Sequence, residues 1–126
     1  MKTILLLMAL TASLAFADSA AEKCAKTRLR TFTVTASTGN IQIVAADSNG
    51  SRTICMISFN ADTVGNIKFT TGTGTNCGTG TADFSGLWYS ATGLVMPSFT
   101  LPSGLALCVN FSATVNAGGV YQVVSQ

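Results

Sequence analysis

The sequence predicts an all-β protein: a single antiparallel β-sandwich of about seven strands, immunoglobulin-like or jelly-roll-like in layout, disulfide-stabilised and preceded by a cleaved signal peptide. Three observations lead to this prediction. Apolar and polar residues alternate in several short runs, Gly and Asn pairs separate these runs, and the 126 residues include four cysteines but no histidine. Alternation with period two turns one side of a strand toward a core and the other toward solvent.

The N-terminus has the composition of a secretory signal peptide. Lys2 gives a basic start, residues 4–10 form an apolar run, and Ala15-Phe16-Ala17 is a small-residue cleavage site. The apolar run is too short to cross a bilayer, which takes roughly 20 residues. We expect cleavage after residue 17 and a secreted, extracellular protein with no membrane span. A buried N-terminal helix is the alternative interpretation.

The remaining chain divides into an N-terminal arm, residues 18–30, and a β-sandwich domain, residues 31–126. Residues 52–60 are apolar almost throughout, which favours a central strand that is buried on both faces. Asn49-Gly50, Gly65-Asn66 and Gly118-Gly119 supply turns, because Gly and Asn tolerate a positive φ. The alternating runs that predict the other strands are residues 32–35, 41–43, 67–70, 105–113 and 120–124.

The four cysteines are expected to form two disulfides, because an exported protein folds in an oxidising compartment. Cys24, Cys55, Cys77 and Cys108 are separated by 31, 22 and 31 residues, with no C-x-x-C pair, which disfavours a four-thiolate metal site. Four cysteines allow three connectivities, and the sequence does not choose among them. We prefer Cys24–Cys55 and Cys77–Cys108, which join the arm and the glycine-rich loop to the body.

The segment 71–81 is a glycine- and threonine-rich loop. Its G-x-G repeats resemble a phosphate-binding loop, but no helix follows and no P-loop lysine is present. We therefore interpret it as a long inter-strand loop whose polar side chains contact a ligand or a subunit. The candidate residues are Thr73, Thr75, Asn76 and Thr79.

Trp88 and Tyr89 form an aromatic pair in which both side chains carry a polar group. If exposed, such a pair stacks against a sugar ring; if buried, it belongs to the core. Together with the loop 71–81 it defines a candidate glycan-contact site.

The sequence does not predict an enzyme, a metal site or a cofactor. Asp47, Asp62 and Asp83 are the only carboxylates of the body, and they are candidates for turn capping or for a glycosidase pair. Asp62 and Asp83, with Asn60, are also candidates for calcium binding. We prefer turn capping, because each lies beside turn-forming residues. No histidine is present to activate a serine.

Basic residues are concentrated in the arm. Lys23, Lys26, Arg28 and Arg30 lie within eight positions, whereas the 96 residues from Thr31 onward contain only five charged side chains. The arm is a candidate for reaching a neighbouring subunit, and Arg28 and Arg30 fit equally well on the solvated face of an edge strand. Without a wider basic field, a nucleic-acid partner is not expected.

Three segments together carry a family resemblance: the run GTGTNCGTGT at residues 72–81, Ile54-Cys55, and Leu105-Ala106-Leu107-Cys108. The chain from around Cys24 to the C-terminus resembles small, largely uncharacterised β-rich proteins found in bacteriophage and metagenomic sequences. The resemblance implies a virion-associated or surface-displayed β-sandwich, and it supplies no catalytic residues.

The sequence thus predicts a non-catalytic, exported structural protein that self-associates and builds or decorates an extracellular or virion assembly. A near-neutral surface that is rich in hydroxyl groups opposes self-association only weakly. The alternative is a secreted, lectin-like module that binds glycans or a cell surface.

Overall fold

The computed structural model describes residues 19–85, 88–90, 94–96 and 98–126, with side chains for residues 19–85 and 98–126. The predicted signal peptide lies outside the described residues. Most of the described chain is β-strand, with one α-helix, α1 (Ala20–Lys26), and one 3-10 turn, η1 (Thr75–Cys77). The strands are β1 (Arg30–Val44), β2 (Arg52–Ala61), β3 (Gly65–Thr73), β4 (Thr79–Asp83), β5 (Trp88–Ser90), β6 (Leu94–Met96), β7 (Phe99–Leu101) and β8 (Ala106–Ser125).

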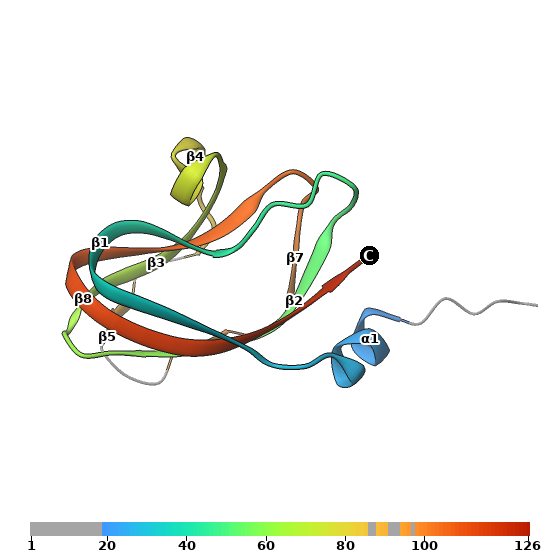
Figure 1. Cartoon of the computed structure of the whole chain (residues 1–126), viewed down its shortest axis with the longest axis horizontal. Helices are drawn as coiled ribbons and strands as arrows, with labels where there is room; N and C mark the ends of the chain where they lie inside the picture. Colours follow the sequence, from blue (N-terminus) through green and yellow to red (C-terminus); the bar gives the residue numbers. More distant parts are fainter. Residues whose placement is uncertain (1–18, 86–87, 91–93, 97) are drawn as a thin grey trace, which may run out of the picture.

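The 20-residue strand β8 is the centre of the sheet. β1 pairs with one edge of β8 along its length, from Arg30 opposite Tyr121 to Val44 opposite Leu107. β2 and β3 pair with the other edge of β8, one after the other. The short strands β6 and β7 extend the sheet beside β2, and β4 and β5 extend it beside β3. All these pairings are antiparallel and join the described strands into one sheet (Figure 1).

The long strands bend together near the middle of β8. The register of β1 shifts between Val34 and Gly39, and Ala36 in this stretch has a φ of 44°. β2 ends at residue 61 and β3 begins at residue 65, so the chain between them turns at the same level. Such register shifts increase the local twist and bend a strand. Figure 1 shows β1 and β8 curling at this point, which brings the two halves of the sheet to face each other.

A hydrogen-bond network made by Ala36, Asp62 and Asn116 fixes the bend, and we call it the corner network. The backbone N–H and the side-chain amide of Asn116 donate to the Asp62 carboxylate at 2.9 and 2.7 Å. The backbone N–H of Asp62 donates to the Asn116 carbonyl at 2.9 Å. Asn116 Oδ1 accepts a hydrogen bond from the N–H of Ala36, also at 2.9 Å. The Asn116 side chain of β8 thereby links β1, through Ala36, and the connection between β2 and β3, through Asp62, at the level where the sheet bends.

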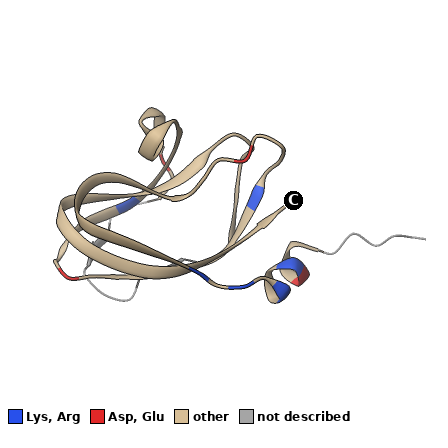
Figure 2. Ribbon diagram, in the orientation of Figure 1, with Lys and Arg blue, Asp and Glu red and all other residues tan. Residues whose placement is uncertain are grey.

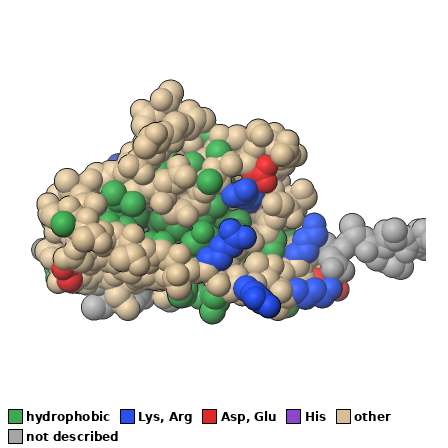
Figure 3. All heavy atoms as spheres, viewed as in Figure 1, with side chains coloured by type: hydrophobic (Ala, Val, Ile, Leu, Met, Phe, Trp, Pro, Cys, Tyr) green, Lys and Arg blue, Asp and Glu red, His purple; other side chains and the backbone are tan. Residues whose placement is uncertain are grey.

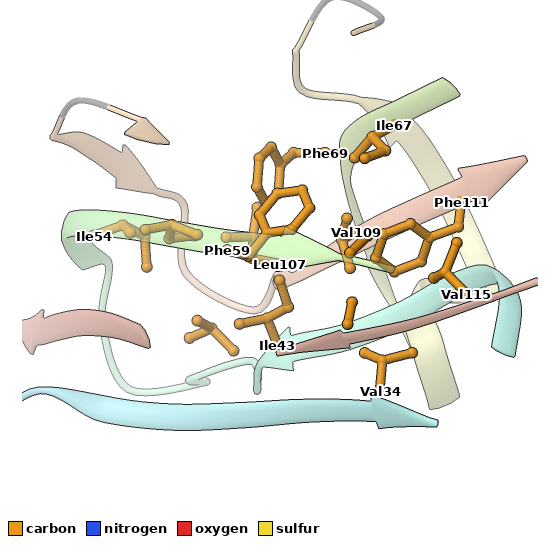
Figure 4. Packing of buried hydrophobic residues seen from close by; sticks show 14 of the residues in the cluster. Val34, Ile43, Ile54, Phe59, Ile67, Phe69, Leu107, Val109, Phe111 and Val115 are labelled. Carbon is orange, nitrogen blue, oxygen red and sulfur yellow. The ribbon is translucent and has the colours of Figure 1, made fainter. Parts of the chain in front are cut away.

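The hydrophobic core fills the space between the two halves of the bent sheet. Phe59 of β2 packs edge-on against Phe69 of β3 and Phe111 of β8, with ring centroids 6.0 and 6.1 Å apart. Figure 4 shows Val34 and Ile43 of β1 pointing into the same cluster from the opposite side. Because the buried residues come from both halves, the hydrophobic effect that drives their burial also holds the sheet closed.

A glycine permits the closest packing within this sheet. Gly119 lies in β8 between β1 and β2, and a Cβ at this position would lie 2.7 Å from the Cβ of Phe59 and 2.8 Å from the Phe32 ring. The Phe32 ring also packs against Tyr121, with centroids 6.4 Å apart. At the neighbouring Gly118 a Cβ would meet only the Phe32 carbonyl oxygen, at 3.7 Å.

The β-rich fold and both disulfides are confirmed, whereas finer sequence predictions change. A two-sheet sandwich is not confirmed, because the described strands belong to one curled sheet, and these strands number eight. Residues 32–35 and 41–43 are parts of one strand, β1, because the chain bends between them without leaving β8. Gly118-Gly119 forms no turn and lies inside β8, where close packing requires a glycine at position 119.

The substitution Gly119→Ala is expected to lower the free energy of unfolding by about 1–3 kcal/mol, because the added methyl group overpacks the site. Gly118→Ala is the matched control, since its methyl group would make an ordinary van der Waals contact. Urea denaturation of both variants with the disulfides intact measures the difference. Equal unfolding midpoints would contradict this account of Gly119.

The corner network predicts a pH dependence of stability. The hydrogen bonds from the side chain and backbone of Asn116 lower the pKa of the Asp62 carboxyl below its usual value of 3.8. Because the folded pKa lies below the unfolded one, the stabilising contribution is present above the unfolded pKa. It is lost as the pH falls through the lowered, folded pKa.

Denaturant midpoints measured between neutral pH and strongly acidic pH test this. The wild-type protein is expected to lose more stability on acidification than Asp62→Asn, which has no carboxyl to protonate at the corner. Asp47→Asn separates the contribution of the other aspartate with a lowered pKa. A wild-type curve that is parallel to the Asp62→Asn curve over the acidic range would rule out the assignment to Asp62.

Candidate functional site

The outer edge of β1 has no neighbouring strand in the described part of the chain. The opposite borders of the sheet end in strands of three to five residues, whereas β1 has 15. From Arg30 to Val34 β1 pairs residue by residue with β8, without a register shift. We call this stretch the open edge. Regular, unpaired strand edges expose rows of N–H and C=O groups that can pair with another chain.

Apolar side chains are accessible next to the open edge. Phe32 and Ile41, one from each arm of the bent β1, are half-buried and pack against the core. Figure 3 shows hydrophobic side chains at the surface between the two arms of β1. The core therefore reaches the surface on the side of the molecule where β1 is the last strand.

The second half of β1 is protected from strand pairing. Its register shifts again between Gln42 and Val44. The N–H of Gln42 is already used, because it donates to Asn76 Oδ1 of η1 at 3.1 Å. Within the described part of β1, the open edge is thus the longer stretch of regular pairing, and it has no strand on its outer side.

The predicted loop 71–81 is a β-hairpin connection in the structure: β3 ends, η1 follows, and β4 returns beside β3. Cys77 is buried and joined to Cys108 of β8, as preferred from the sequence. Gly72 permits this approach, because a Cβ there would lie 2.8 Å from the Cys77 carbonyl oxygen. The loop is therefore held firmly against the outer face of the sheet.

The candidate polar residues of this loop are exposed. Thr73 Oγ1 donates to the Thr79 carbonyl at 3.4 Å, and the Asn76 side chain is bound to β1. The Thr75 and Thr79 hydroxyl groups form no hydrogen bond with the part of the chain that the structure describes. These two hydroxyl groups are the ones available to an external partner.

The aromatic pair and the loop do not come together. The side chains of Trp88 and Tyr89 lie outside the described residues, but their backbone in β5 pairs with Ile67 and Asn66 at the start of β3. The loop begins at Thr73, at the other end of the same strand. At about 3.3 Å per residue the two candidates are separated by about 20 Å along β3.

The arm forms a short helix that the sequence analysis missed. Ser19 Oγ accepts from the N–H of Glu22 at 3.3 Å, and the Glu22 carboxylate accepts from the N–H of Ser19 at 2.9 Å. This pattern is a capping box, and the spacing S-x-x-E was the sequence signal for it. The Cys24–Cys55 disulfide ties α1 to β2, again as preferred from the sequence. The Thr27 carbonyl accepts a hydrogen bond from Gln122 at 2.7 Å.

The four basic residues of the arm lie close together in the structure. Lys23 and Lys26 occupy the last turn of α1, Arg28 lies between α1 and β1, and Arg30 is the first residue of β1. Figure 2 shows Lys and Arg in α1 and in the segment that leads from it into β1. In the described ranges no ion pair involves Arg28 or Arg30.

The three body aspartates serve separate structural contacts. Asp47 accepts from the backbone N–H of Asn49 at 3.0 Å and from Arg52 Nε at 3.3 Å, and these interactions lower its pKa. Asp83 forms an ion pair with Lys68 at 2.7 Å, and Asp62 belongs to the corner network. The three aspartates thus take part in three separate sets of interactions.

Within the described ranges there is no pocket and no group of three or more His, Cys, Asp or Glu side chains that could hold a metal ion. No helix among the described residues has the length and apolar character needed to cross a membrane. No protein-family model matches the chain, and no curated protein matches it significantly. The geometry of the open edge and of the basic arm is therefore the basis for any functional assignment.

Removing the first disulfide by Cys24→Ala/Cys55→Ala is expected to unfold α1, because isolated helices shorter than about 12–15 residues are marginal in water. Hydrogen exchange should show faster exchange at residues 23–27, and the unfolding free energy should fall by about 2–4 kcal/mol. Cys77→Ala/Cys108→Ala is the control, which should release η1 and leave α1 unchanged. Unaltered protection of α1 in the first variant would show that the hydrogen bonds alone hold the helix.

Proposed function

We propose that the chain is a non-catalytic, exported structural protein that builds or decorates an extracellular or virion assembly, and that the open edge of β1 is its contact with a neighbouring copy. The observation that carries this proposal is the regular, unpaired edge from Arg30 to Val34, with accessible core residues beside it. Strand addition at such an edge extends the sheet across the interface by backbone hydrogen bonds.

The sequence of the open edge is compatible with pairing to a second copy of itself. In an antiparallel pair centred on Phe32, Arg30 of each copy lies opposite Val34 of the other. Thr31 then lies opposite Thr33. Like charges are not opposed, and cross-strand threonine pairs stabilise a sheet modestly. Such a contact is isologous and has two-fold symmetry.

The apolar side chains next to this edge strengthen the proposal. A neighbouring strand would cover the half-buried Phe32 and Ile41 and remove their apolar surface from water. Burial of apolar area is the main favourable term in protein association. At this site the backbone hydrogen bonds would fix the orientation of the second copy, and burial of the apolar side chains would contribute most of the free energy of association.

The charge distribution of the body also supports assembly. Beyond residue 30, Asp47 is paired with Arg52 and Asp83 with Lys68. Few uncompensated charges therefore repel a second copy across the body. The glycan-binding alternative has less support, because the threonine-rich loop and Trp88-Tyr89 lie at opposite ends of β3.

Sedimentation velocity of the mature chain, residues 18–126, tests the proposal with a matched pair of variants. Thr33→Lys introduces a charge at the open edge and is expected to shift a concentration-dependent oligomer toward monomer, because edge charges oppose strand pairing. Thr100→Lys makes the same change at an exposed threonine of β7, on the other side of β2, and should leave the association unchanged.

A wild-type chain that stays monomeric at high concentration would contradict assembly through this edge. An equal loss of association in both lysine variants would show that net charge, and not the open edge, controls self-association.

A further inference from the structure

The helix α1 is held in place although none of its residues is buried. A capping box starts it, a disulfide links its centre to β2, and Gln122 binds the chain just after its end. Lys23 Nζ also approaches the Ser125 carbonyl, at 3.5 Å. α1 adds no buried side chain to the core, and yet a disulfide fixes it. The consequence of fixing it is that its exposed side chains are held in a defined position.

The exposed side chains that the arm positions are mainly cationic. Lys23 and Lys26 are three residues apart on a helix and share a face. Arg28 lies between α1 and β1, Arg30 is the first residue of β1, and both residues are exposed. The arm thus presents a row of four cations within eight residues of sequence.

The described acids that lie nearest to the arm in the sequence are engaged in other contacts. The Glu22 carboxylate is engaged by the N–H and hydroxyl groups of Ser19. Asp47 pairs with Arg52. Across the described residues the two arginines of the arm have no acidic partner. Two of the four cations are therefore available in full to an external anion.

The residues around the four cations indicate which class of polyanion fits the site: a lipid surface, a nucleic acid or an anionic polysaccharide. The arm carries one exposed large apolar side chain, Leu29 between the two arginines, and α1 (AAEKCAK) carries none, so the arm has no continuous apolar face for insertion into a lipid surface. The arm also lacks an aromatic side chain on which a nucleic-acid base could stack. A chain of carboxylate or sulfate groups needs neither feature, and the planar guanidinium of arginine binds such groups through two parallel hydrogen bonds.

We infer that Lys23, Lys26, Arg28 and Arg30 form a binding site for an anionic polysaccharide. This inference rests on the extracellular location in the proposed function, where such polymers are the accessible polyanions. It does not depend on the open edge. In an assembled particle the site would attach the subunit to a carboxylated or sulfated surface polymer.

Binding of the mature chain to surface-immobilised dextran sulfate and to alginate tests this, with neutral dextran, duplex DNA and phosphatidylglycerol vesicles as comparison probes. Arg28→Gln/Arg30→Gln is expected to weaken binding to the anionic polysaccharides about fivefold or more and to flatten its salt dependence. Lys68→Gln removes a cation from a different part of the fold and should change the affinity less than about twofold. Arg28→Lys/Arg30→Lys keeps the charge and is expected to recover only part of the affinity.

An equal effect of Lys68→Gln and of either single arginine-to-glutamine change would overturn the inference, because a diffuse positive field and not this site would then be responsible. Binding of DNA or vesicles as tight as that of dextran sulfate would overturn the choice of ligand class. No binding of either anionic polysaccharide at low salt would also overturn it.

Thermal unfolding of each variant confirms that the fold is retained. The oligomeric state, measured separately, reports on the proposed assembly: a monomer that binds dextran sulfate refutes the assembly alone.

Discussion

The fold depends on the corner where β1 and β8 bend and where the chain turns from β2 into β3. A sheet whose long strands stayed straight would leave one face of β1, β2, β3 and β8 open to water. The bend turns that face inward and makes a single sheet enclose its own core. The Asn116 side chain is central, because its amide donates to Asp62 and its oxygen accepts from Ala36. Without these hydrogen bonds, the polar groups that the register shifts release would have to be solvated individually.

The same bend explains why one side of the molecule differs from the other. On the side of β2 and β3, four short strands continue the sheet, and the rings of Phe84 and Phe99 meet at 4.5 Å. On the side of β1, the described residues supply no further strand, so the sheet ends at a long strand whose first stretch, Arg30 to Val34, is regular. The core is thus covered at one end and partly accessible at the other, next to Phe32. The proposed interaction surface on β1 therefore rests on the topology of the sheet and requires no special loop or pocket.

The sequence predicted the strand-rich fold because alternation reports directly which side chains face a core. It did not predict the continuity of the strands. Gly118-Gly119 has the composition of a turn, but Gly119 lies in β8 where the Ser58 carbonyl, Phe59 and the Phe32 ring leave no room for a Cβ, and only the three-dimensional packing reveals this. Both disulfide pairs were preferred correctly, although the spacing alone allowed two other connectivities. The helix was missed because seven residues are too few to show a helical period, although Ser19 and Glu22 carried the capping signal.

The two candidate surfaces place different demands on the fold. The open edge requires regular backbone, which β8 enforces on the stretch from Arg30 to Val34 through consecutive strand pairing. The basic arm requires a fixed position for a segment that has no core of its own, and the disulfide at Cys24 together with Gln122 provides it. Arg30 belongs to both surfaces, since it ends the cationic row and begins the open edge. In the proposed antiparallel pair Arg30 faces Val34 of the other copy, so the same residue can end the cationic row without opposing a like charge across the subunit contact.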